Sequence, residues 1–318
     1  MIKIVLMALC IAWSVLSLRA QSWSALNIQT KPAFTFTVND TLSFPVYVVS
    51  TPQDSALYFA TNLTTNVCND QICLPIEINL FWDLLGNYHH FSKEQHVAFT
   101  KFDHQYFDEG DYQKLNALLL DTLSPLRDYQ VEDLLDKDAQ KYSAEVDAVT
   151  RPTSLLFSNV SVPGALYTGY TLWHIVNGPI KDALHKYLQE QYRARKWQLY
   201  FADSTVPAYQ EYFLKNLSPS ESKAYNTQVV ALLFAEDDFI PHYAIDILQQ
   251  GDLLSNPANY NTILMQIDRL KPHVTTEIIS AISSPNEQTR ELLTRFSKSQ
   301  KANPRQKELI KKLLDYEK

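Results

Sequence analysis

Alternation of apolar and polar residues dominates the first part of the chain. Side chains on a strand point to opposite faces in turn, so a period of two predicts β-strands. Asn39-Asp40 supplies a turn between the first two runs. We therefore expect a small sheet of about five or six strands in this region. The alternating or β-rich runs are 33–38, 42–49, 57–60 and 76–83.

A period of three to four residues replaces this alternation at 111–120 and again from residue 163 to the end. Pro163 and Gly178 stand where capping preferences place the start and end of a helix, and Pro179 starts another. Later apolar pairs fall in short segments of about 10–14 residues each. Short helices with regular breaks are typical of an α-solenoid of the HEAT type. The breaks carry Gly251-Asp252, Pro257, Pro272, Pro285 and Pro304.

Together these patterns predict an α+β architecture in two parts. A β-rich α+β domain occupies residues 21–160, and an all-α helical-repeat domain, HEAT-like, occupies 161–318.

Residues 1–20 have the features of a secretory signal peptide. Lys3 precedes an apolar stretch at 4–18, and Ala20-Gln21 offers a cleavage point. The apolar stretch is too short to span a bilayer. We therefore expect cleavage near Ala20 and an exported protein, periplasmic or secreted, with no membrane span after cleavage.

Composition excludes several classes of function. The chain has only 6 glycines, and it contains neither the G-x-G-x-x-G nor the P-loop pattern that cradles phosphates. It also lacks the G-x-S-x-G and H-E-x-x-H motifs, so the sequence contains no motif that would indicate a common hydrolase or a zinc protease. With 28 basic against 35 acidic residues, the net charge of −7 argues against a nucleic-acid partner.

Two cysteines, Cys68 and Cys73, remain once Cys10 leaves with the signal peptide. An exported compartment is oxidising, so this closely spaced pair predicts a disulfide. One interpretation is a structural clip across a strand turn, and the other is a redox-active pair.

The segment at 147–153 reads Asp-Ala-Val-Thr-Arg-Pro-Thr. It resembles the covalent flavin-attachment motif of FMN-binding domain proteins, and Asp147, Thr150 and Thr153 fall on the fixed positions of that motif. Nearby segments are similar to those of exported bacterial proteins that carry the motif. These segments are 68–75, 81–87, 100–104 and 164–174.

The resemblance implies a flavoprotein with FMN joined to Thr153 through a phosphoester bond by a flavin transferase. Such a protein transfers electrons outside the cytoplasm, and the flavin supplies the electron chemistry. The protein would then be an electron carrier rather than an independent enzyme.

This chain departs from the motif at Arg151-Pro152, where the family has a small pair, usually Gly-Ala. Arg151 can pair with a phosphate, but Pro152 restricts Arg151 to an extended backbone. The alternative is a plain loop in which Thr153 or Ser154 caps the next helix.

Aromatic residues form a stripe on the predicted helix that follows. Tyr167, Tyr170, Trp173 and His174 lie at spacings of three and four. Tyr170 and His174 are therefore candidate flavin-binding residues, although a stripe of this kind equally suits a helix core.

Histidines cluster at His89, His90, His96 and His104, with Asp103 beside the last. Neighbouring residues of a regular strand point to opposite faces, so at most one of His89 and His90 joins any site. No metal-ligand spacing is present, and we predict no metal site.

Two further functions remain open. The helical repeats could form a cofactor-free scaffold that binds a protein partner. The hairpin 68–75 also resembles the active hairpin of the immunoglobulin-like periplasmic domain of thiol–disulfide transporters, which implies thiol–disulfide exchange by Cys68 and Cys73. No complete set of nucleophile, base and oxyanion donor is evident.

Overall fold

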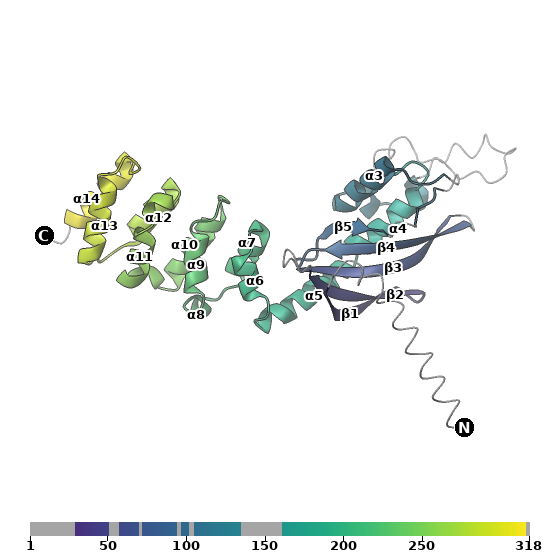
Figure 1. The fold of residues 1–318 in the computed structure, drawn as a ribbon, viewed down its shortest axis with the longest axis horizontal. Coiled ribbons are helices and arrows are strands. Elements are labelled where there is room, and N and C mark those ends of the chain that lie inside the picture. Colours follow the sequence, from purple (N-terminus) through teal and green to yellow (C-terminus); the bar gives the residue numbers. More distant parts are fainter. Residues whose placement is uncertain are drawn as a thin grey trace, which may run out of the picture. The chain divides into compact units, whose positions relative to one another are not determined.

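The computed structural model describes residues 29–50, 57–69, 72–93, 97–101, 105–134 and 161–315. The chain divides into two compact units, Met1–Glu190 and Gln191–Lys318. The first contains an antiparallel sheet with helices and the second is helical (Figure 1). This confirms the predicted α+β architecture. The predicted signal peptide and the segment 147–153 lie outside the described residues.

The sheet is a five-stranded antiparallel meander in which each strand pairs with the next along the chain. Three of the four runs predicted as strands lie within it, and the fourth, 76–83, ends one residue beyond β4. The third run is the start of a longer strand, since the polar threonines and asparagines after residue 60 continue the pairing. The strands are β1 (Gln29–Asn39), β2 (Leu42–Ser50), β3 (Leu57–Asn69), β4 (Ile72–Trp82) and β5 (Tyr88–Ser92).

One face of the sheet is covered by helices of the same unit (Figure 1). These are α3 (Glu109–Leu120), α4 (Leu166–Asn177) and the first part of α5 (Ile180–Arg193). Ile78, Leu80 and Trp82 alternate along β4 and are fully buried. The Trp82 indole N–H donates to the Val176 carbonyl oxygen of α4 at 3.0 Å, so this set of side chains faces the helices.

Helix α3 begins with a capping box. The Asp108 carboxylate accepts a hydrogen bond from the Asp111 amide, and the Asp111 carboxylate accepts one from the Asp108 amide. Asp111 also forms a buried ion pair with Lys101 at 2.7 Å. Two short 3₁₀ helices follow, η1 (Pro125–Arg127) and η2 (Val131–Leu134).

Helix α4 begins at Leu166, later than the predicted start at Pro163. Gly164 lies between them with a φ of +70°. This left-handed conformation favours glycine and is incompatible with an α-helix, so the helix starts only after it. A Cβ at this position would lie 3.3 Å from the Cβ of Lys101. Gly178 caps the C-terminus of α4, as predicted.

The second unit consists of short helices that contact one another in chain order (Figure 1). Helices α7, α10, α12 and α14 form one layer, and α6, α9, α11 and α13 form the other. Its elements are α6 (Gln198–Asp203), α7 (Pro207–Lys215), α8 (Pro219–Ser222), α9 (Asn226–Leu232), α10 (Ile240–Gln250), η5 (Leu253–Ser255), α11 (Pro257–Leu264), η6 (Ile267–Arg269), α12 (Pro272–Ala281), α13 (Glu287–Ser297) and α14 (Pro304–Asp315).

Prolines explain where most of these helices begin. Pro257, Pro272 and Pro304 are the first residues of α11, α12 and α14. The first helical position has no intrahelical partner for its N–H, so proline is tolerated there. Pro285 instead lies before the Asn286 cap of α13.

A buried polar network joins α11 to α13 in this unit. The Thr289 hydroxyl lies 2.8 Å from Asn261 Oδ1 and 2.7 Å from Asn286 Oδ1. Asn261 Nδ2 donates to Asn286 Oδ1 at 3.2 Å. Because buried polar groups cost free energy unless they are hydrogen-bonded, the network sets the register of these two helices.

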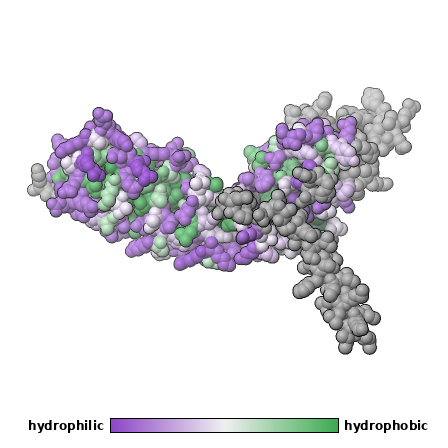
Figure 2. Space-filling view, in the orientation of Figure 1, coloured by the Kyte–Doolittle hydropathy of each residue, from purple (hydrophilic) through white to green (hydrophobic). Residues whose placement is uncertain are grey.

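Hydrophilic residues cover most of the visible face of the helical unit, with hydrophobic residues between them (Figure 2). Within the described ranges, no helix combines the length and apolar character needed to cross a membrane.

Candidate functional site

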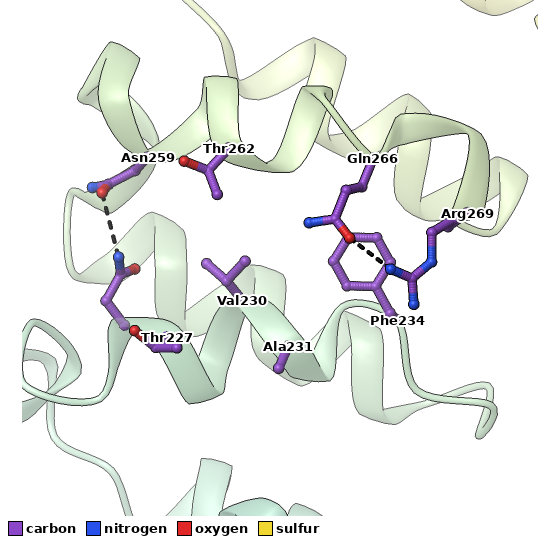
Figure 3. A pocket seen from close by; sticks show the side chains of 9 residues that line it. Thr227, Val230, Ala231, Phe234, Asn259, Thr262, Gln266 and Arg269 are labelled. Carbon is purple, nitrogen blue, oxygen red and sulfur yellow. Dashed lines mark hydrogen bonds between the residues drawn. The ribbon is translucent and has the colours of Figure 1, made fainter.

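A groove of about 500 Å³ lies between α9 and α11, neighbouring helices of one layer (Figure 3). Both walls come from exposed or half-buried side chains of the helical unit. The lining residues are Asn226, Thr227, Val230, Ala231, Phe234, Asn259, Thr262, Gln266 and Arg269.

The first wall is one face of α9 and the turn after it. Thr227, Val230, Ala231 and Phe234 follow a spacing of three and four residues, so they share one side of the helix. Val229 and the two leucines after Ala231 are buried on the side that faces the core. The amphipathic pattern of α9 therefore turns its less hydrophobic face to the groove.

The second wall runs along α11 and η6. Asn259, Thr262, Gln266 and Arg269 recur at intervals of three and four, and the apolar residues Ile263 and Ile267 between them are buried. The helical repeat of three to four residues places the isoleucines in the core. It therefore presents the side chains of the other four residues, two amides, a hydroxyl and a guanidinium, to the groove.

Phe234 and Arg269 meet across the groove at one end (Figure 3). The Arg269 Cζ lies 5.1 Å from the centre of the Phe234 ring, a cation–π geometry. Arg269 Nη1 also donates to Gln266 Oε1 at 2.6 Å. These two contacts hold the guanidinium in place at the mouth of the groove.

At the other end, two asparagines join the walls. Asn226 Nδ2 donates to Asn259 Oδ1 at 3.3 Å, and Asn259 Nδ2 donates to the Leu253 carbonyl at 2.9 Å. The buried Asn226 Oδ1 has no hydrogen-bond partner among the described residues. This amide pair sets the spacing of the two helices at that end.

An acidic loop follows Phe234, and the carboxylates of Asp237 and Asp238 in it have partners. Asp237 Oδ1 accepts from the amides of Phe239 and Ile240 at the start of α10. Asp238 pairs with Lys271 at 2.7 Å, and this hydrogen bond lowers the pKa of the Asp238 carboxyl. Lys271 also donates to the backbone of this loop.

On the sheet, the prediction for the histidine pair is wrong. Phe81 pairs with His90 while Trp82 pairs with Tyr88, so His89 is an extra residue in a β-bulge. The bulge brings His89 Nδ1 to 2.7 Å from His90 Nδ1. His90 stacks on Phe81, with ring centres 4.3 Å apart.

Burial, together with the smaller effect of the nearby His89, lowers the pKa of His90 to about 4. The His90 ring is therefore uncharged at neutral pH, and its Nδ1 lies within hydrogen-bond distance of His89 Nδ1. Across the described residues, no three His, Cys, Asp or Glu side chains converge as a metal site would require. His96, Asp103 and His104 lie outside those residues.

Tyr170 and His174 lie together on α4, with ring centres 4.3 Å apart. His174 Nε2 donates to the Leu126 carbonyl at 2.9 Å, and burial lowers the pKa of this histidine. Trp173 Nε1 donates to the Asp121 carbonyl at 2.8 Å. The polar atoms of the stripe thus fasten α4 to the chain after α3. The structure does not describe Asp147, Thr150 or Thr153, so their relation to α4 stays a prediction.

Cys68 and Cys73 are register partners in the hairpin of β3 and β4. Opposed residues in an antiparallel pair have Cα atoms about 4.5–5.5 Å apart, which lies within the range for a disulfide. The backbone therefore suits the predicted disulfide, whereas the two side chains are outside the described part of the structure.

The groove residues were missed by our sequence analysis, which counted only the apolar side of each helix. The sequence does show a second stripe at 227–234, which contains both polar and apolar residues. Such a stripe on a single helix usually faces water, so by itself it does not indicate a binding site. Only its pairing with the stripe on α11 makes a site. No family model matches the chain, and neither a curated protein nor a solved structure matches it.

Proposed function

We propose that this protein binds a protein partner, and that its helical unit holds an extended peptide segment of that partner in the groove between α9 and α11. The observation that carries the proposal is the pair of facing helical stripes, one on each wall, with a groove between them. Helical repeats commonly present such surfaces to partners.

The dimensions of the groove suit a short peptide. Residues 226–234 cover roughly 12 Å at the helical rise per residue, which about three or four extended residues would span. Val230, Ala231 and Phe234 offer apolar contact, and the amides of Asn259 and Gln266 can hydrogen-bond to a peptide backbone.

The chemistry of the lining favours binding over catalysis. The groove contains amides, hydroxyls and one guanidinium, and its nine lining residues include no carboxylate, imidazole or thiol. A hydroxyl without a neighbouring base is a weak nucleophile, and no general base faces Thr227 or Thr262 among these residues.

A peptide array tests the proposal with the full mature chain. Ala231 is exposed in the groove wall, so Ala231→Trp should fill the groove and remove peptide binding. The matched control is Ala224→Trp, an exposed alanine outside the groove. Equal binding by wild type and Ala231→Trp would exclude the groove as the binding site.

A second proposal rests on the flavin-attachment motif rather than on the groove. Asp147, Thr150 and Thr153 match that motif, which supports an exported electron carrier with covalent FMN on Thr153. Co-expression with a flavin transferase should add the mass of one FMN group, and Thr153→Ala should lack this gain. A mature chain with the bare polypeptide mass would contradict the flavin proposal and leave the binding proposal standing.

A further inference from the structure

We infer that the groove between α9 and α11 selects a peptide segment that carries a carboxylate, and that the Arg269 guanidinium binds this carboxylate at the Phe234 end. This inference rests on the proposed peptide-binding function. It adds the chemical class of the ligand and the end of the groove at which its carboxylate binds.

Arg269 has the donors that a carboxylate needs. Its guanidinium carries five N–H groups in a planar fork, which matches the two oxygens of a carboxylate. One nitrogen donates to Gln266, and the residue is exposed. Throughout residues 161–315, Arg269 has no carboxylate partner of its own.

The side chain is also held in position before a ligand arrives. The Phe234 ring lies against the guanidinium, and Gln266 restrains one edge of it. The backbone of Arg269 is fixed by a hydrogen bond from its amide to the Gln266 carbonyl at 2.9 Å. A pre-organised arginine loses less side-chain entropy on binding, so more of the interaction appears as affinity.

Nearby acidic groups do not occupy this arginine. Asp237 is bound to the amides that open α10, and Asp238 is paired with Lys271. Lys301 Nζ donates to the backbone carbonyl of Asp268 at 2.9 Å. Asp268 directly precedes Arg269, so this hydrogen bond places a second cation close to Arg269. A carboxylate of the ligand therefore approaches a cation that has no carboxylate partner among the described residues, and two of the acidic side chains near it, Asp237 and Asp238, are held by other groups.

The test uses an array of defined tetrapeptides probed with the full mature chain. Each peptide is displayed with a free C-terminal carboxylate, with an amidated terminus, or with an amidated terminus and an internal Glu, Gln or Lys. Carboxylate-bearing peptides should bind at least about fivefold more tightly than the matched amide or Gln peptides. The arms distinguish a terminal carboxylate from a side-chain carboxylate.

Arg269→Gln should remove this preference, and Arg305→Gln, a change at an exposed arginine of α14 outside the groove, should keep it. Arg269→Glu should reverse the preference toward peptides that carry Lys. Because Arg269 is exposed, these variants should fold, which far-UV circular dichroism checks.

Two outcomes separate this inference from the proposed function. The carboxylate inference alone is overturned if Ala231→Trp removes peptide binding but peptides with and without a carboxylate bind equally. It is also overturned if Arg269→Gln still prefers peptides that carry a carboxylate. Binding that Ala231→Trp leaves intact, or no binding to any peptide, overturns the groove proposal and this inference with it.

Discussion

The Trp82 indole donates a hydrogen bond to the Val176 carbonyl oxygen across 94 positions of sequence. Val176 lies in the last turn of α4, where helix carbonyls lack intrahelical partners. The fully buried indole thus satisfies a helix terminus while filling the space between β4 and α4.

Replacing this indole with a smaller ring should destabilise the sheet unit. Trp82→Phe removes the N–H donor and leaves the Val176 carbonyl buried and unpaired, at an expected cost of about 2–3 kcal/mol. Hydrogen exchange of the β3 and β4 amides in urea measures this change. Tyr106→Phe, at an exposed position, is the control and should change stability by less than about 0.5 kcal/mol. An equal effect of both changes would show that the Trp82 bond is dispensable.

The histidine bulge should make the stability of the sheet unit depend on pH. The folded pKa of His90 is lowered to about 4, whereas an unfolded histidine titrates near 6.5. The unfolded chain therefore binds more protons between these values, so stability is fully present above about pH 6.5 and falls as the pH drops toward 4. Urea unfolding at a series of pH values measures the slope.

His90→Phe retains a ring against Phe81 and removes the titrating group, so it should flatten this slope. The control is His185→Gln, a change at an exposed histidine of α5. A slope unchanged in His90→Phe would assign the pH dependence to other groups.

The register of β3 and β4 predicts a disulfide between Cys68 and Cys73. The purified protein should be lighter than its reduced form by two hydrogens, and Cys68 and Cys73 should not react with an alkylating reagent. Reducing so short a loop should cost about 2 kcal/mol by chain entropy. A structural clip should resist mild reduction of the native protein.

Rapid alkylation of both cysteines under mild reduction would instead favour thiol–disulfide exchange. Cys68→Ser and Cys73→Ser separate the two interpretations further. If the bond is structural, both variants should lose the same stability, and neither should form a mixed disulfide with glutathione.

The buried network between α11 and α13 should be sensitive to loss of one hydroxyl. Thr289→Val preserves the shape of the side chain and leaves Asn261 Oδ1 without its hydroxyl donor, at an expected cost of about 1–3 kcal/mol. Thermal unfolding of the helical unit measures the loss. Thr294→Val, a change at a less buried threonine of the same helix, should cost less than about 0.5 kcal/mol. Similar values for the two variants would contradict the role assigned to the network.

Local patterns predicted much of the fold because their causes are local. The period of two over 42–49 and 76–83 marks β2 and β4, since alternate side chains of each strand are buried. Pro257, Pro272 and Pro304 mark helix starts, because a proline ring fits the first turn and disrupts the interior. The start of α4 was misplaced, since Pro163 signalled a helix that Gly164 delays.

Other features depend on partners that are distant in sequence. The His89 and His90 rings lie within hydrogen-bond distance of each other only because β5 pairs with β4 through a bulge. The amide of Asn259 and the guanidinium of Arg269 form a binding surface only because α11 lies opposite α9. No window of the sequence contains both walls of the groove.

The sequence by itself determined the order of strands and helices, the starts of several helices, and the existence of two structural classes in one chain, since hydrophobic period and proline position act over a few residues. Tertiary structure decided which exposed stripes face each other, because the separation of α9 and α11 follows from side-chain packing throughout the helical unit. The candidate groove is therefore a feature that only the tertiary structure reveals.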